Sequence, residues 1–450
     1  MATVKSDGGD AQRSSVGSNG APVVRRAPFS SNPTVGARGA QAQQRLLDAA
    51  LQVFGEVGYH QTGIVRITEV AGCSRASFYQ YFSNKADAFR QLAADLGHEL
   101  IASAEVLDEV GPDQVGWDAL RAFMDRHTAI VMRYRPIFDV FPDAVQSDVA
   151  VATGSARVVG RHVGGVRSKV VGSTLPPDQI DDVISLLLGC VMRAPRVAPL
   201  LRVGDRKVGI DRQRLNDALT DLLHRTLFGP TPEVNAREER PPTKVKPRTD
   251  GTSKLEQVAQ ASDDLTPAGA RTRESLIEAA TSVLVTRGYH GTRVDDVTEK
   301  AGVSHGAFYR YFDNKDELVT TVAIRALFNI RGAFTKIPTI TNDADRRSTD
   351  EALQSWLEKY VTTYASEAAL VRVWVDATSD DPTLGVESAG ALEWGRSRLV
   401  NFLAPRGFGD IDADALLMIV LLEVLTAARR DPRTLTGGVT IIERALVGID

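Results

Sequence analysis

Residues 292–312 read Thr-Arg-Val-Asp-Asp-Val-Thr-Glu-Lys-Ala-Gly-Val-Ser-His-Gly-Ala-Phe-Tyr-Arg-Tyr-Phe, and this stretch decides the fold. Gly302 can supply a tight turn after a short helix, because glycine accepts backbone angles that other residues avoid. Ser304 follows it and is a preferred first residue for a second helix. Phe308 and Phe312 are four residues apart, so they share one face of that helix. Helix, glycine turn and helix in this order predict a helix-turn-helix.

The same pattern occurs twice in the chain, 230 residues apart. Without a gap, 40–89 pairs with 270–319, and 20 of the 50 positions are identical. Equivalent turn, cap and core positions in the first copy are occupied by Gly72, Ser74, Phe78 and Phe82. The sequence therefore predicts two helix-turn-helix motifs, at about 63–82 and 293–312.

Fainter similarity continues downstream, which indicates that a whole subunit was duplicated. Residues 182–191 align with 414–423 at an offset of 232 residues, and 141–144 align with 374–377 at an offset of 233. Both copies end on apolar helical stretches, and these predict either ordinary core or a four-helix seam between the copies, which we favour. We expect a disordered tail over 1–39, a first helix-turn-helix domain over 40–100, a first helical regulatory domain over 101–228, a linker over 229–269, a second helix-turn-helix domain over 270–330 and a second regulatory domain over 331–450.

Apolar spacing is helical along nearly the whole chain. Leu46, Ala49, Ala50, Val53 and Phe54 follow the three-and-four pattern of one helix face, and the second copy repeats that face. Even the valine-rich stretch 158–171 keeps helical spacing. The predicted fold class is all-α, with two tandem units.

Composition excludes several classes of protein. The chain has 450 residues, 43% hydrophobic and 24% charged, so it is long enough for more than one domain. Two cysteines cannot build a disulfide framework, and the dispersed histidines lack metal-ligand spacing, so we expect no metal and no cofactor. No run is long enough to cross a membrane and no apolar signal segment begins the chain, which predicts a cytoplasmic protein. A net charge of −4 means that any binding to DNA must come from a local surface.

The residues expected to read DNA lie on the second helix of each motif. Arg75 and His305 stand near its start, where a recognition helix presents side chains to base edges in the major groove. Tyrosines next to the buried phenylalanines can offer hydroxyl groups to phosphates. Lys85 and Lys315 begin the following helix, where the helix dipole disfavours a cation; a bound phosphate would resolve that conflict.

At these positions the chain resembles the TetR/AcrR family, and the tandem build is similar to regulators of actinobacteria. The resemblance implies a three-helix DNA-binding domain followed by an α-helical ligand-binding and dimerisation domain in each unit. It places the DNA-contacting positions at Arg66, Ser74, Arg75, Ser77, Tyr79, Tyr81 and Lys85 in the first copy and at Arg293, Ser304, His305, Ala307, Tyr309, Arg310, Tyr311 and Lys315 in the second. Thr62 and Thr292 are placed to cap the next helix and are counted with them. Two positions depart from the family pattern, because Arg66 replaces an acidic residue and Ala307 replaces a hydroxyl residue.

Aromatic residues mark two candidate ligand sites. Trp356, Tyr360 and Tyr364 recur every four residues, which is typical either of core alone or of core that also lines a pocket. The complete set of pocket candidates is Phe123, Ile130, Tyr134, Phe138, Trp356, Tyr360, Tyr364 and Trp374. The family resemblance implies a small-molecule inducer. Apolar lining favours an apolar one, and the likeness to actinobacterial lipid-import regulators implies a lipid-like one.

Three functional hypotheses follow. The first is a ligand-released repressor whose halves form an intrachain pseudo-dimer, with or without further homo-oligomers, and read a non-palindromic operator. The second is a sensor or interaction protein with one competent reader, because 292–318 carries net charge −2 and 62–90 carries +2. The third is an enzyme, suggested only by a Gly-x-Ser-x-Gly match at 302–306 that lacks the preceding strand; we expect no enzyme. Cys73 before the first recognition helix is interpreted as a small apolar residue in preference to a redox switch.

Overall fold

The chain was analysed in a computed structural model, which describes residues 37–138, 149–200, 202–203, 206–207, 209–230, 234, 240–243, 265–338, 346–378, 385–406, 408–427 and 431–448. The predicted tail lies almost wholly outside these residues, as does most of the predicted linker.

The described residues form helices connected by short turns, and the predicted all-α class is confirmed. The first half contains α1 (Ala37–Gln61), α2 (Ile64–Val70), α3 (Arg75–Tyr81), α4 (Lys85–Glu105), α5 (Gln114–Arg133), α7 (Val149–Arg167), α8 (Ile180–Val197), a 3₁₀ turn η2 (Ala198–Leu200) and α9 (Arg212–Phe228). The second half contains α11 (Pro267–Gly291), α12 (Val294–Ala301), α13 (His305–Phe308), α14 (Lys315–Phe334), α15 (Arg346–Thr378), α16 (Gly385–Leu403), a 3₁₀ turn η3 (Ala404–Arg406), α17 (Ile411–Ala427), α18 (Pro432–Ile441) and a π-helical turn η4 (Ile442–Val447). One small ladder pairs β1 (Arg202–Val203) antiparallel with β2 (Arg206–Lys207).

Three apolar cores hold the helices together. Two of them are equivalent, and each packs the first helices of a half around the helix-turn-helix. We call these three-helix units with their cores the first reader (α1–α3) and the second reader (α11–α13). The third core is the largest, and buried residues of α8, α9, α15, α17 and α18 all contribute to it. The two halves therefore share a core, and each reader has its own.

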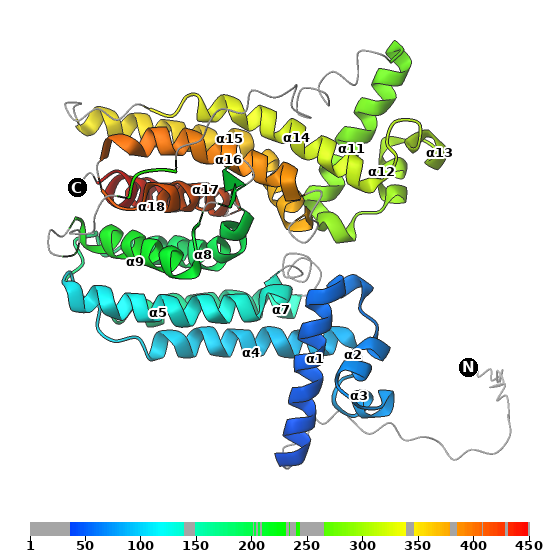
Figure 1. Cartoon of the computed structure of the whole chain (residues 1–450), viewed down its shortest axis with the longest axis horizontal. Coiled ribbons are helices and arrows are strands. Elements are labelled where there is room, and N and C mark those ends of the chain that lie inside the picture. The colour runs from blue at the N-terminus through cyan, green and yellow to red at the C-terminus, as the bar shows by residue number, and fades with distance from the viewer. Residues whose placement is uncertain are drawn as a thin grey trace, which may run out of the picture.

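Helices from the two halves pack directly on one another in that central core. α8 and α9 of the first half lie against α17, α18 and η4 of the second half (Figure 1). A glycine makes close approach possible, because a Cβ added at Gly189 of α8 would lie 2.9 Å from a methyl group of Val424 on α17. Each half contributes a pair of helices, so four helices meet at this contact.

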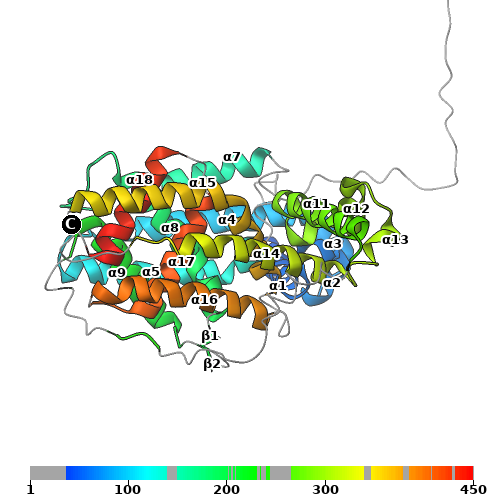
Figure 2. The same ribbon diagram turned by 90° about the horizontal axis from the view of Figure 1, so that it is seen from above.

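Both readers lie at the same end of the molecule. α1–α3 and α11–α13 are grouped at the end opposite to the C-terminus in Figure 1, and the perpendicular view in Figure 2 keeps them at that end. α4 and α14 run from the readers towards the centre of the molecule, so each reader is connected to its regulatory helices by one long helix.

A short described segment of the predicted linker is bound to the second half. Arg240 donates its backbone N–H to the carbonyl of Gly409 at 3.0 Å. Thr243 donates its N–H and its hydroxyl to the carboxylate of Asp412, at 3.0 and 2.6 Å. In place of a free coil, 240–243 is therefore anchored at the start of α17. No helix in the described part of the chain is both long and apolar enough to span a membrane.

Candidate nucleic-acid interface

The two helix-turn-helix units are built by the same turn and the same cap. Gly72 and Gly302 have φ values of 64° and 68°, the left-handed region that favours glycine. Ser74 accepts a hydrogen bond from the backbone N–H of Ser77 at 3.2 Å, and Ser304 accepts one from that of Ala307 at 3.3 Å. The predicted turns and caps are confirmed, and they fix where each recognition helix starts.

Paired phenylalanines hold the recognition helix to the reader core. Phe78 and Phe82 are fully buried with ring centroids 5.4 Å apart, and Phe308 and Phe312 repeat the contact at 5.7 Å. This face of the helix points inward as the four-residue spacing predicts, so the opposite face points outward.

Outward-facing residues differ between the readers at the first helical position. Arg75 and His305 both begin the recognition helix and both are exposed. Tyr79 and Tyr309 are also exposed, with 45% and 52% of their surface accessible. The same outward positions therefore carry a guanidinium in one reader and an imidazole in the other.

Tyr81 and Tyr311 contribute less exposed surface than their neighbours. Tyr81 is buried at 7% accessibility and Tyr311 is half-buried. The rings pack as the sequence indicates, so little more than the hydroxyl group can face a DNA backbone. Their contact with phosphate stays a prediction.

Thr62 and Thr292 do not cap the second helix, and that expectation is wrong. The N-cap residues are Gly63 in the first reader and Arg293 in the second. Each threonine hydroxyl instead donates backward, Thr62 to the carbonyl of Gly58 at 2.7 Å and Thr292 to that of Gly288 at 2.6 Å. Both glycines have positive φ and break the first helix there, which exposes these carbonyls to a side-chain donor.

Lys85 and Lys315 begin α4 and α14 as predicted, but their ammonium groups point at backbone carbonyls. Lys85 Nζ donates to the carbonyls of Tyr59 and Thr62 at 2.7 and 3.0 Å, and it lies 4.6 Å from the Tyr59 ring centroid. Lys315 donates to those of Tyr289 and Thr292 at 3.0 and 3.4 Å, with the ring 3.9 Å away. Burial lowers the pKa of both lysines. The frayed end of the first helix therefore supplies the negative dipole that the dipole argument assigned to phosphate.

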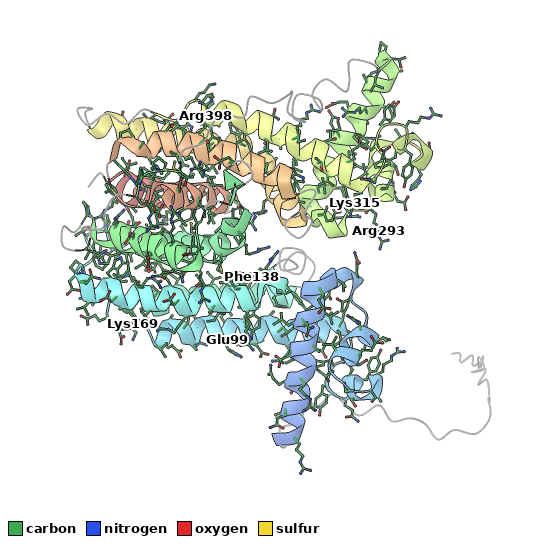
Figure 3. The ribbon with its side chains drawn as sticks, in the orientation of Figure 1. Glu99, Phe138, Lys169, Arg293, Lys315 and Arg398 are labelled. Atoms are coloured by element: carbon green, nitrogen blue, oxygen red, sulfur yellow. The ribbon has the colours of Figure 1, made fainter. Side chains whose placement is uncertain are left out.

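Charges around the second helix are exchanged between the readers. In the first reader Arg66 lies 3.6 Å from Glu56 of α1, and in the second Asp296 lies 2.6 Å from Arg287 of α11. The departure of Arg66 from the family pattern is thus matched by an acid on the neighbouring helix. Figure 3 shows Arg293 and Lys315 at the edge of the second reader.

The second recognition helix has an acidic neighbour that the first lacks. His305 Nε2 lies 3.3 Å from the carboxylate of Asp295 on α12, and the equivalent residue in the first reader is Val65. A carboxylate beside the base-facing residue opposes the approach of phosphate. Reasoning from the sequence recorded the local charge difference but missed this pair.

Tyr59 and Tyr289 are the structural residues that sequence reasoning missed. The words Gly-Tyr-His and Asn-Lys are identical in both copies, and in the structure they meet, because the lysine of one word binds the tyrosine of the other. Their identity in both copies was the available signal.

The candidate pocket residues are distributed over all three cores. Phe123, Trp356, Tyr360 and Tyr364 belong to the central core, Ile130, Tyr134 and Phe138 to the core of the first reader, and Trp374 to that of the second. Tyr134 donates to Glu99 at 2.7 Å, and Trp356 donates to the carbonyl of Ala333 at 3.0 Å. The stripe on α15 is a real aromatic stack, with centroids of Trp356 and Tyr360 5.6 Å apart. A groove of about 440 Å³ between α1 and α5 is lined by none of these residues.

The two cysteines are unpaired thiols, and burial raises the pKa of both. Cys73 packs against the core of the first reader, so its contact is the apolar one that the sequence favours. Among the described residues, no cluster of three or more His, Cys, Asp or Glu side chains is arranged to hold a metal ion.

Comparison with known proteins connects this geometry to a family. Residues 46–92 and 276–322 both match the model of bacterial regulatory proteins of the tetR family. The chain is 30% identical over 141 residues, 28% of its length and 64% of the relative, to an HTH-type transcriptional activator, FasR, of Mycolicibacterium smegmatis. It is 31% identical over 81 residues, 18% of its length and 39% of the relative, to the HTH-type transcriptional repressor KstR2 of Rhodococcus jostii. The alignments thus span less than two thirds of these curated relatives.

A crystal structure of a transcriptional regulator from Rhodococcus is also similar. It has 22% sequence identity and a TM-score of 0.32, and the match covers 38% of this chain and 92% of that one. The family matches fall on the two readers, on the caps, turns and buried phenylalanines described above. The chain therefore belongs to the TetR type of bacterial regulatory protein, with two tandem units in one polypeptide.

Proposed function

We propose that this chain is a sequence-specific DNA-binding transcriptional repressor, acting in the cytoplasm, whose two halves pair within one polypeptide. The observation that carries the proposal is the equivalence of the two readers. Each has a glycine turn, a serine cap and a buried phenylalanine pair, and each presents the start of its recognition helix to solvent. This is the geometry by which a helix-turn-helix places side chains in the major groove.

Pairing within the chain is supported by the central core. Four helices from the two halves share it, and both readers lie at one end of the molecule (Figure 2). Because a linker joins the halves, their pairing is effectively intramolecular, at roughly millimolar local concentration. One chain is then the functional equivalent of a dimer.

The operator is proposed to be non-palindromic. Arg75 and His305 occupy the same position in the two readers, and arginine prefers the acceptor edge of guanine in the major groove. The first reader is the more demanding one, and each half-site has its own sequence.

Single substitutions in the full chain test this reading. Arg75→Ala should lose about tenfold or more in affinity on the first half-site, and His305→Ala should lose affinity on the second. Arg157→Ala, an exposed arginine on α7 distant from both readers, is the matched control and should leave both preferences unchanged. A gel-shift series at fixed salt measures all three. Loss on the same half-site for Arg75→Ala and His305→Ala contradicts the proposal.

Regulation by an apolar, lipid-like inducer is the second part of the proposal. The stack of Trp356, Tyr360 and Tyr364 on α15 supports it, because such a stripe can move apart to admit an apolar molecule. The inducer acts by favouring a spacing of the readers that misses successive major grooves, about 34–36 Å apart. Titration of long-chain and polycyclic apolar ligands should release the chain from DNA; unchanged DNA affinity with every ligand removes this part.

Repression is distinguished from activation by a reporter. One similar relative is named an activator and another a repressor. Deleting the gene should raise transcription from the bound promoter if the chain represses, and lower it if the chain activates.

A specific observation favours an alternative, in which only the first reader binds DNA. The carboxylate of Asp295 lies beside His305, whereas Arg75 has no such neighbour at the equivalent position. In that case His305→Ala changes nothing, while Arg75→Ala abolishes sequence preference.

A further inference from the structure

The two central helices at the contact of the halves carry opposite charge. α8 of the first half has Arg193 and Arg196 in its C-terminal part, and its only acids stand in its first turn. α17 of the second half has three acids, among them Glu423 near its C-terminal end, and no lysine or arginine. Neither helix carries the partner charge for its own buried group.

Arg193 and Glu423 meet across this contact. Arg193 Nε lies 2.8 Å from Glu423 Oε1, and the two side chains are 10% and 15% exposed. The two atoms are not aligned as a hydrogen bond, so the contact is an ion pair. Arg372 of α15 approaches the same oxygen at 3.9 Å. The carboxylate is enclosed, since it contributes with burial to raising the pKa of Cys190 on α8 and of Tyr360 on α15.

The repeat shows what stands at the equivalent positions. At the offset of 232 residues, Arg193 corresponds to Leu425 and Glu423 corresponds to Val191. A register one residue different substitutes Val424 and Met192, which are equally apolar. The duplicated contact is therefore an ion pair on one side of the pseudo-twofold axis and an apolar pair on the other.

Pairing of like halves would lose this match. Two first halves would place Arg193 of each against apolar side chains of the other, and two second halves would do the same with Glu423. Removing the partner of a buried charge is far more costly than replacing both partners by apolar groups. Only a first half against a second half satisfies the ion pair and the apolar pair together.

A second contact at the other end of α17 acts in the same direction. Arg214 of α9 donates from Nη2 to Asp410 at 2.7 Å, and its guanidinium lies 3.6 Å from Asp412. α9 and α18 begin after Asp211 and Asp431, so Arg214 stands where α18 has Thr434. Two second halves would lose this arginine as well.

We infer that Arg193 and Glu423 form a charge key that makes the central contact specific for a first half against a second half, so that like halves of two chains do not pair. The inference rests on the proposed pairing of the halves as the functional unit. Its test measures mass and melting without DNA, so a failure of the key and a failure of DNA reading are separate results.

Charge reversal in the full chain gives the first readout. Arg193→Glu and Glu423→Arg each place like charges at the contact, and each should lower the melting temperature by several degrees. The double variant restores opposite charges, and it should recover most of the loss. A double variant as unstable as the sum of the single variants contradicts the inference.

Co-expression of the two single variants gives the second readout and tests selection directly. The first half of the Arg193→Glu chain matches the second half of the Glu423→Arg chain, and the two remaining halves keep the native pair. A heterodimer of about twice 48.6 kDa should therefore form by native mass spectrometry. If single variants are insoluble alone, recovery of soluble heterodimer on co-expression supports the key; insolubility of the co-expressed chains and of the double variant overturns it.

A matched control uses an ion pair inside the second half. Arg325 and Glu274 lie within 2.7 Å of each other on α14 and α11 and are largely exposed. Co-expressing Arg325→Glu with Glu274→Arg should give chains of single mass. Heterodimers from this control pair would show that charge reversal alone causes exchange, and would contradict the inference.

Discussion

At the scale of single residues, Lys85 and Lys315 show how one side chain can connect two helices. Each ammonium group joins the start of one helix to the broken end of another, through carbonyls and a tyrosine ring. The sequence indicated a cation at a helix start and left its partner to be supplied by phosphate. Its partner is set by the fold of residues twenty-six positions away, which no local pattern contains.

Replacing Lys85 by Met separates the structural role from a phosphate contact. The variant should lose about 1–3 kcal/mol of unfolding free energy, because two charge-assisted hydrogen bonds disappear. If Lys85 also neutralises a phosphate, the slope of log affinity against log salt falls by about 1. Denaturant unfolding and salt-dependent gel shifts measure the two effects, with Lys315→Met as the equivalent change; unchanged stability contradicts the structural role.

Removing the acid beside the second recognition helix should strengthen that reader. Asp295→Asn keeps the size of the side chain and removes a charge that opposes phosphate, so affinity for the second half-site should rise two- to fivefold at low salt. The effect should vanish at high salt. Val65→Asn in the first reader introduces the same amide without a charge change and is the control. No change for Asp295→Asn at low salt would mean that this carboxylate does not limit the second reader.

At the scale of elements, the helix-turn-helix was the most predictable part of the chain. Ser74, Ser304 and the glycine turns act locally, over three or four residues, and the repeat showed each of them twice. Thr62 was misassigned because the first helix breaks at Gly58 and extends past it, and this geometry depends on packing against α4. The candidate pocket residues were dispersed for the same reason, since membership of a core is decided by tertiary contacts.

A buried histidine pair between α5 and α7 makes the first regulatory domain sensitive to acid. His127 and His162 stack with centroids 5.1 Å apart beside Phe123, and their ring nitrogens have no hydrogen-bond partner. Burial lowers the pKa of His127 to about 3 and that of His162 to about 4. Both stay neutral in the folded chain, while the unfolded chain binds protons below about pH 6.5.

Stability should therefore fall as the pH falls through 6.5. Because the unfolded state binds more protons in this window, the two histidines together should remove about 3 kcal/mol between pH 6.5 and pH 5. His127→Phe should roughly halve this loss. Denaturant titrations at both pH values measure it, and the exposed His98→Phe on α4 is the control. A pH dependence unaffected by His127→Phe would assign the loss to other groups.

At the scale of the whole molecule, the contact of the halves depends on a close approach of α8 and α17. The sequence indicated that apolar helices end each half, but the crossing is set by Gly189, which no periodicity distinguishes. Gly189→Ala should destabilise the chain by about 1–3 kcal/mol, because its Cβ would lie 2.9 Å from Val424.

Gly160→Ala is the matched control for that substitution. Gly160 is exposed on α7 with open space around its Cβ position, so alanine should stabilise the helix by up to about 1 kcal/mol. Thermal unfolding compares the two variants. Equal effects of both would mean that the crossing of α8 and α17 is not closely packed.

The central claim is that one chain reads two different half-sites, and the stoichiometry of the operator complex tests it most directly. Native mass spectrometry of the full chain on DNA footprinted from its own upstream region should give one chain per operator. The footprint should cover two unlike half-sites about one helical turn apart. Two chains on a palindromic site would contradict the account.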